Sequence, residues 1–175
     1  MRNIFLLIVL MLILLVINNL FSQNNAQADV LPEWFGQITD DDYFYGFGQA
    51  ESANYRATVS RATAFAIAEA SISVEAHLQR LIDFFIADLG IDDEEVIEQI
   101  NDVLRIVSNQ RFSGAKVINS QVTDLVDGNF KALIQYSIPK IEVNSHLINE
   151  FSYDEKLYDL IKKSRTFTEI ENELK

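Results

Sequence analysis

Side chains of increasing size recur every four positions through the middle of the chain. This spacing places them along one side of an α-helix, so the pattern predicts a helix over residues 53–87. Ser52 or Asn54 has the side chain expected of its N-cap. The first half of this ridge is small enough to pack very closely and the second half is large; its members are Ala62, Ala66, Ala70, Val74, Leu78 and Ile82.

The segment just before this helix alternates as a strand does. Over Tyr43–Glu51, three aromatic side chains share one face, and Gly46 and Gly48 share the other. Because glycine has no side chain, another element can approach the strand backbone on that second face. We therefore expect the alanine half of the helix to pack there. The predicted packing residues are Gly46, Gly48, Ala62, Ala66 and Ala70.

The long helix would extend beyond a small sheet, because 35 residues span about 50 Å. Gly90 is suited to its C-terminal end. Asp92 with Glu95 has the spacing of a capping box and predicts a second helix to about Asn109. Its apolar stripe is the expected partner of the large half of the first helix; the stripe comprises Val96, Ile100, Val103 and Val107, and it would face Leu78, Leu81, Ile82 and Phe85.

Two strands follow, over residues 115–126 and 130–140, and Asp127-Gly128-Asn129 between them is a hairpin signal. The second strand alternates, with apolar residues from Phe130 to Ile138 on one face and Lys131, Gln135 and Ser137 on the other. This alternation predicts an antiparallel sheet with one solvated face. Pro139 either ends the pairing or places this strand at an edge.

The C-terminal residues 141–175 are expected to form a helical extension. Ser152 with Glu155, and Thr166 with Glu169, predict short helices near residues 153–163 and 167–174. The fold class is therefore α+β: about three antiparallel strands packed on a long alanine-rich helix, with a second helix and short C-terminal helices. Residues 29–42 form an extended lead-in, whose Trp34 is expected to dock on the sheet or under a helix end.

The N-terminal segment is apolar from Ile4 to Ile17 and follows a single positive charge. This pattern predicts a signal peptide over residues 1–28, released after Ala26-Gln27-Ala28. An uncleaved anchor from Ile4 to Phe21 is the alternative, since 18 residues barely cross a bilayer. With either a signal peptide or an anchor, the remainder of the chain would be exported to the periplasm or cell envelope.

Composition narrows the classes of partner. A net charge of −12 argues against nucleic acid and against docking on anionic lipid, both of which require a basic surface. The chain has no cysteine. This excludes disulfides, thiol catalysis, thiolate metal sites and lipid attachment through cysteine. Contact with a membrane is expected only through an uncleaved N-terminal segment.

The sequence contains three motifs: Pro32-Glu-Trp-Phe, Tyr45-Gly-Phe-Gly-Gln-Ala-Glu and the alanine-rich run from Ala57 to Ala70. Together they resemble the LPP20 family of bacterial envelope proteins. The likeness covers about residues 32–140, and residues 43–140 would form the LPP20-like domain. Relatives include outer-membrane lipoproteins and flagellar accessory proteins. The resemblance implies an envelope protein that binds or assembles, and it supplies no catalytic residues. Because this chain lacks the lipidation cysteine, lipid anchoring is not carried over.

The candidate chemistry is sparse, and we expect no cofactor and no metal. Gly46 and Gly48 lie where a dinucleotide motif would have glycines, but Glu51 replaces the third and would repel a pyrophosphate. The acidic runs 40–42 and 92–95 lack the ligand spacing of a calcium loop. Neither His77 nor His146 belongs to a zinc-binding pair.

Three functional hypotheses follow. The first is a non-enzymatic exported envelope protein that acts through contacts with envelope proteins or with itself, and Phe84 or Phe85 is its candidate interaction surface. The second is a periplasmic module that holds an apolar or cationic small ligand in a cleft lined by Tyr43, Tyr45 and Tyr136. The third is an enzyme, which would require a histidine beside a carboxylate in an open pocket.

Overall fold

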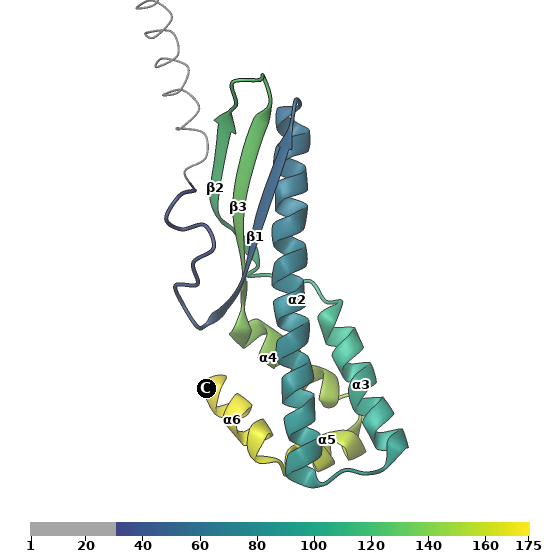
Figure 1. The fold of residues 1–175 in the computed structure, drawn as a ribbon. Coiled ribbons are helices and arrows are strands. Elements are labelled where there is room, and N and C mark those ends of the chain that lie inside the picture. The colour runs from purple at the N-terminus through teal and green to yellow at the C-terminus, as the bar shows by residue number, and fades with distance from the viewer. Residues whose placement is uncertain (1–30) are drawn as a thin grey trace, which may run out of the picture.

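A computed structural model describes residues 31–175, which form one three-stranded antiparallel sheet and five helices (Figure 1). The predicted α+β class is confirmed. The proposed signal segment and the start of the lead-in lie outside the described residues. The elements are β1 (Tyr43–Ser52), α2 (Tyr55–Leu89), α3 (Glu94–Ser108), β2 (Lys116–Asp124), β3 (Phe130–Pro139), α4 (Lys140–Phe151), α5 (Glu155–Ile161) and α6 (Arg165–Glu173).

Helix α2 runs the length of the molecule, with the sheet beside its first half and helices α3–α6 around its second half (Figure 1). The Asn54 side chain caps its start by accepting a hydrogen bond from the Ala57 amide at 3.0 Å. Gly90 ends it in the left-handed conformation, with φ of 62°. The whole predicted ridge from Ala62 to Ile82 is buried, at 0–1% exposure.

The sheet has the strand order β1-β3-β2, and both pairings are antiparallel. The even-numbered residues of β1 face α2. Phe47 belongs to the opposite face, and its backbone amide, at the free edge of β1, donates a hydrogen bond to Glu69 Oε2 of α2 at 2.5 Å. Helix α2 thus supplies an acceptor for an edge amide that has no strand partner, which makes this edge less available for strand addition.

The prediction that one face of β3 is solvated is wrong. Gln135 and Ser137 of β3 are each only 1% exposed, and Lys131 is also buried. Strand β3 is the central strand of the sheet, so the alternative that Pro139 marks an edge strand is also wrong. The cover on the second face includes the lead-in.

The lead-in packs on the sheet face away from α2, where it lies beside the strands in Figure 1. The ring of Phe35 meets that of Phe47 edge-on, with centroids 5.7 Å apart, and Trp34 packs on Phe35 at the same distance. Gln135 Nε2 donates a hydrogen bond to the Gln37 carbonyl at 3.4 Å. Trp34 therefore reaches the sheet through Phe35, and the lead-in covers polar residues that sequence alternation assigns to solvent.

The second half of α2 packs in one core with α3 and the C-terminal helices. Helix α3 contributes Ile100, Val103, Leu104 and Val107, whereas Val96 is only partly buried. Helices α4, α5 and α6 add Val143, Leu147, Phe151, Leu157, Ile161, Phe167 and Ile170. Residues beyond 140 therefore belong to the same hydrophobic core as the long helix.

The predicted helix starts in this half need correction. Helix α3 is capped by Asp93, not Asp92, because the Asp93 side chain accepts a hydrogen bond from the Glu95 amide. Asp154 replaces Ser152 as the cap of α5, and Ser164 replaces Thr166 as the cap of α6. Helix α4 lies within the predicted helical extension, but no capping signal marks it, and it begins directly after β3 without a side-chain cap.

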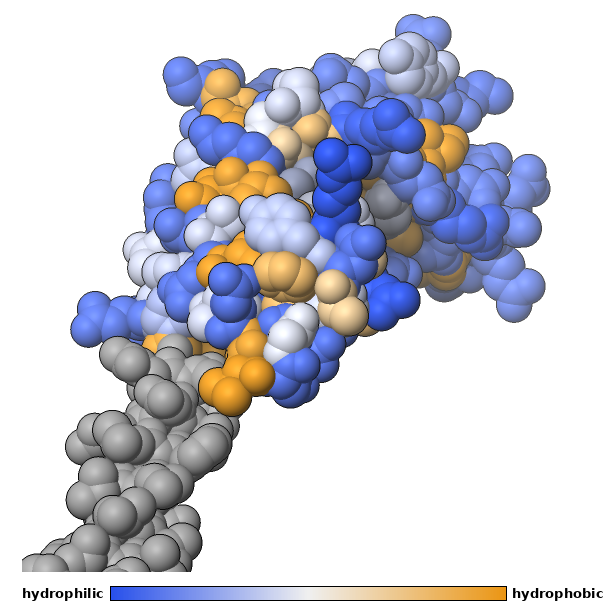
Figure 2. Space-filling view, turned by 90° about the horizontal axis from the view of Figure 1, so that it is seen from above, coloured by the Kyte–Doolittle hydropathy of each residue, from blue (hydrophilic) through white to orange (hydrophobic). Residues whose placement is uncertain are grey.

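None of the helices between residues 31 and 175 combines the length and apolarity needed to cross a membrane. Viewed from the sheet end, the surface is largely hydrophilic and carries several separate apolar patches (Figure 2).

Candidate functional site

The glycine face of β1 is filled by α2 and has no room for a ligand. A Cβ atom on Gly46 would lie 1.9 Å from the Ala66 carbonyl oxygen, and one on Gly48 would lie 1.8 Å from that of Ala62. A phosphate group is far larger than a methyl group, so this strand–helix junction is a packing contact rather than a nucleotide cradle.

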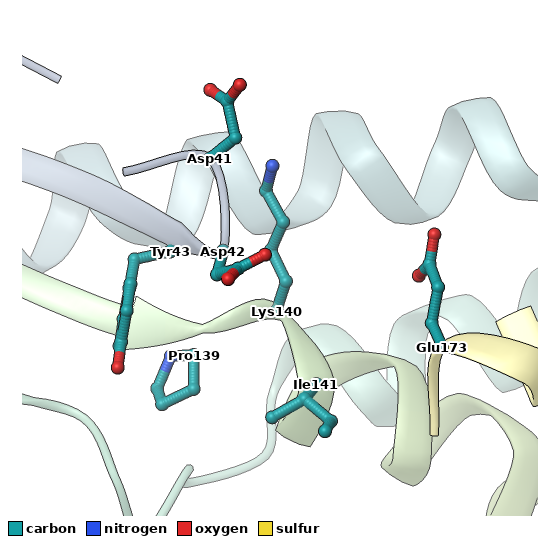
Figure 3. A pocket seen from close by; sticks show the side chains of 7 residues that line it. All are labelled: Asp41, Asp42, Tyr43, Pro139, Lys140, Ile141 and Glu173. Atoms are coloured by element: carbon teal, nitrogen blue, oxygen red, sulfur yellow. The ribbon is translucent and has the colours of Figure 1, made fainter. Parts of the chain in front are cut away.

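A pocket of about 580 Å³ opens where the end of the lead-in meets the start of α4 and the end of α6. Figure 3 shows the polar ends of Asp41, Asp42 and Lys140 on one side of it, while Glu173 enters from α6. Tyr43, Pro139 and Ile141 supply the remaining wall. The Lys140 ammonium also lies 5.5 Å from the centroid of the Phe44 ring. Three carboxylates and one amine give the pocket a net negative lining.

Close to this pocket, a hydrogen-bonded chain joins three helices. His77 of α2 is 2.9 Å from Asn144 Oδ1 through its Nε2 atom. The Asn144 amide in turn donates to Glu173 Oε2 at 3.1 Å. Asn144 is 3% exposed and uses both ends of its amide in these contacts. Because its Oδ1 accepts, His77 donates from Nε2, and the chain ties α2 to α4 and α6.

Burial lowers the pKa of His77 below its usual value of 6.5. The hydrogen bond to Asn144 and the charge of Glu173 act in the opposite direction, whereas the charges of Lys140 and Arg80 lower the pKa further. The Phe44 ring packs on the imidazole with centroids 5.0 Å apart, which adds an apolar neighbour. The neutral imidazole is therefore the favoured form in the folded protein.

This geometry supports a structural role for both histidines. Between His77 and Glu173 stands an amide, which neither takes up nor releases a proton near neutral pH. His146 packs edge-on against Phe112, with ring centroids 5.5 Å apart. Within residues 31–175, neither histidine is hydrogen-bonded directly to a carboxylate.

The depressed pKa of His77 predicts a pH-dependent stability. An imidazole that binds its proton less readily when folded favours unfolding as the pH falls through 6.5. We expect the urea midpoint to fall between pH 7.5 and pH 5.5, and we expect the fall to be smaller in His77→Gln, whose amide can still donate to Asn144. An equal fall in both proteins would contradict this assignment.

The predicted tyrosine cleft is not formed among the described residues. Tyr136 pairs with Gly46 and shares the sheet face that meets α2, whereas Tyr43 and Tyr45 lie on the opposite face. Tyr43 lines the pocket described above. Tyr136 lines a separate hollow of about 310 Å³ between α2 and the segment before β2.

The two adjacent phenylalanines near the end of α2 have different environments. Phe85 is 0% exposed and meets the Phe151 ring edge-on, with centroids 5.7 Å apart. Phe84 is 50% exposed. Phe85 is therefore a core residue, and only Phe84 is available to a partner.

The acidic runs are used in local structure. Asp40 Oδ1 accepts a hydrogen bond from the Asp42 amide and closes a turn, while Asp93 caps α3. Across residues 31–175, no three histidine, aspartate or glutamate side chains are grouped so that they could hold a metal ion.

Comparison with known proteins gives no relative: neither a family model, nor a curated protein, nor a solved structure matches this chain. Functional inference therefore depends on the chain's own geometry.

Proposed function

We propose that this chain is a non-enzymatic, exported envelope protein that acts through protein–protein contacts. The observation that carries the proposal is the set of large apolar side chains exposed on α2. Phe65 is 58% exposed, Ile72 66% and Phe84 50%, on a helix whose inner ridge is fully buried. Phe65 and Ile72 are seven residues apart, so they lie two turns apart on the same side of the helix. Large apolar residues that are exposed together on one side are typical of an interaction surface.

The arrangement of the titratable groups supports a non-enzymatic role. His77 is held by Asn144 and by the Phe44 ring, and His146 is held against Phe112. General acid–base catalysis needs a group that can reach a substrate proton in an open site. Both imidazoles instead hold parts of the fold together.

Envelope location rests on the sequence of residues 1–28 and on the resemblance to the LPP20 family. The same resemblance suggests a surface or flagellar accessory assembly as the setting. The acidic surface disfavours nucleic acid and anionic lipid as partners. The expected partners are therefore other envelope proteins or further copies of the chain.

Cell fractionation with N-terminal sequencing, followed by chemical cross-linking of intact cells, tests the proposal. We expect the chain in the envelope or periplasmic fraction, cross-linked to another protein or to itself. Recovery from the cytoplasm, or an exported chain that is monomeric and captures no envelope protein, would contradict the proposal.

A second candidate function is binding of a cationic small molecule in the 580 Å³ pocket, favoured by Asp41, Asp42 and Glu173 in its lining. A small diamine such as putrescine is a suitable probe for calorimetry. This candidate predicts saturable binding that is weakened about tenfold or more in Asp41→Asn/Asp42→Asn. Absence of a binding isotherm at millimolar diamine would eliminate it.

A further inference from the structure

A groove separates α2 from α3 on the surface of the helical half. Two adjoining hollows, of about 410 Å³ and about 270 Å³, share Glu75, Leu104 and Arg105 in their linings. Because they share walls from both helices, they form one continuous depression. Helix α3 has 15 residues, so the groove is about 20 Å long.

The groove has three apolar residues in its lining, and the uncharged remainder is polar: Ser71, Gln79, Asn101, Ser108 and Asn109. Leu104 is buried at its base, and Ile97 is half-buried beside it. Ile72 of α2 lines the same depression and is 66% exposed, although it is a large aliphatic residue. Phe65 lies seven residues earlier, two helical turns away on the same side of α2, and extends the apolar path toward the sheet.

The rim of the groove is acidic. Glu75 from α2 and Glu94 and Glu98 from α3 are all exposed. No described side chain forms an ion pair or hydrogen bond with any of the three. The one cation at the rim, Arg105, is already bound to Asp102, with Nη1 2.7 Å from Oδ1. The rim therefore keeps an uncompensated negative charge around the apolar residues of the lining.

We propose that this groove binds an amphipathic helix of a partner protein, with aliphatic residues on one face and lysine or arginine along its flanks. A trough between two helices fits the ridge of a third helix, whose aliphatic residues would contact Leu104, Ile97 and Ile72. The acidic rim would pair with the basic flanks and would disfavour acidic helices. The inference rests on the proposed function and names the surface and partner chemistry for it.

The same charges disfavour a second copy as the occupant. The chain carries a net charge of −12, and an acidic helix from another copy would bring carboxylates against Glu75, Glu94 and Glu98. A groove dedicated to self-association would be expected to carry charges of both signs. A basic partner would neutralise the negative charge of the rim.

The test uses the full-length protein and a synthetic helix of about 18 leucine and lysine residues that carries a benzophenone photo-cross-linker. A matched peptide with glutamate in place of lysine is the first control. We expect the lysine peptide to cross-link to residues of α2 and α3, and we expect at least about tenfold less cross-linking of the glutamate peptide.

Two variant pairs separate the groove from the overall charge. Glu75→Lys/Glu98→Lys should reduce the yield about tenfold or more, whereas Glu33→Lys/Asp124→Lys, with the same change of net charge at exposed sites elsewhere, should preserve it. Ile72→Gln should weaken binding about tenfold, whereas Ile38→Gln, at an equally exposed isoleucine of the lead-in, should not.

An equal loss of cross-linking yield in both charge-reversed pairs would overturn the groove as the binding site, because it would show that the peptide is attracted to the acidic surface as a whole. Cross-linking that is lost in Phe84→Gln and kept in Ile72→Gln would also overturn the groove as the binding site and leave the proposed function intact. The same holds if the cross-links form through contacts between copies of the chain. If the peptide does not cross-link but an envelope partner is captured in cells, the groove proposal fails and the proposed function stands. Failure of that capture in cells overturns the proposed function itself.

Discussion

Gly48→Ala is expected to destabilise the protein severely. The added Cβ atom would lie 1.8 Å from the Ala62 carbonyl oxygen and 2.6 Å from the Ala66 amide nitrogen, and both of these are backbone atoms of a continuous helix. A rotamer change cannot relieve that overlap, so α2 must move away from β1. Movement opens the alanine contact along its whole length.

The expected loss is about 4 kcal/mol or more in the free energy of unfolding, at the severe end for a single substitution. Domains of this size have about 5–15 kcal/mol in total. Urea denaturation followed by circular dichroism measures it, with Gln49→Ala as the matched control in the same strand, because Gln49 is exposed. If the two variants unfolded at the same urea concentration, the packing of α2 on the glycine face would be refuted.

Phe85→Ala is expected to cost about 3–5 kcal/mol, because it removes a fully buried ring and leaves a cavity. The cavity would lie between α2 and α4, where the Phe85 and Phe151 rings meet edge-on. This contact joins the C-terminal helices to the long helix. The variant should therefore also increase amide hydrogen exchange in α4.

Phe84→Ala provides the control for this prediction. It is the same substitution one residue away, on a side chain that is 50% exposed, and a change within about 0.5 kcal/mol is expected. Comparable losses for the two variants would place Phe84 in the core and remove it from the set of available contact residues.

The elements with strong periodicity could be predicted from the sequence. The four-residue ridge from Ala62 to Ile82 locates α2, and the absence of side chains at Gly46 and Gly48 indicates which face of β1 it covers. The Asp127-Gly128-Asn129 signal locates the hairpin, in which Gly128 has φ of 83°. In each case a local rule and the tertiary contacts select the same structure.

The errors fall where tertiary contacts decide the structure. Helix α4 starts at once after a strand and contains the β-branched residues Ile141 and Val143, so its first turn resembles further strand. Its stripe of Val143, Leu147 and Phe151 is visible only once the helix is considered. The cap shifts of one or two residues arise because neighbouring serine, threonine and aspartate residues are all competent caps.

The candidate sites are formed by residues that are far apart in the sequence and close together in the structure. Nothing in the spacing of His77, Asn144 and Glu173 indicates that they meet, because they come from three helices. Similarly, the acidic residues of the α2–α3 groove look in sequence like ordinary solvated positions. The sequence pattern could identify Phe84 and Phe85 as an exposed and buried pair, but it could not assign which was which.

The two sides of α2 therefore have different tasks. Its inner side joins the sheet to the helical half through the ridge from Ala62 to Ile82. Its outer side presents Phe65 and Ile72 beside the acidic groove with α3. On this account, the inner side specifies the fold and the outer side makes the contacts.

In-cell photo-cross-linking from a photoreactive amino acid at position 72 tests this division most directly, with position 49 on the exposed side of β1 as the comparison. We predict a cross-linked partner protein from position 72 that is absent from position 49 and is lost in Glu75→Lys/Glu98→Lys. A result in which position 72 yields only uncross-linked chain, while the chain is folded and exported, would contradict the account.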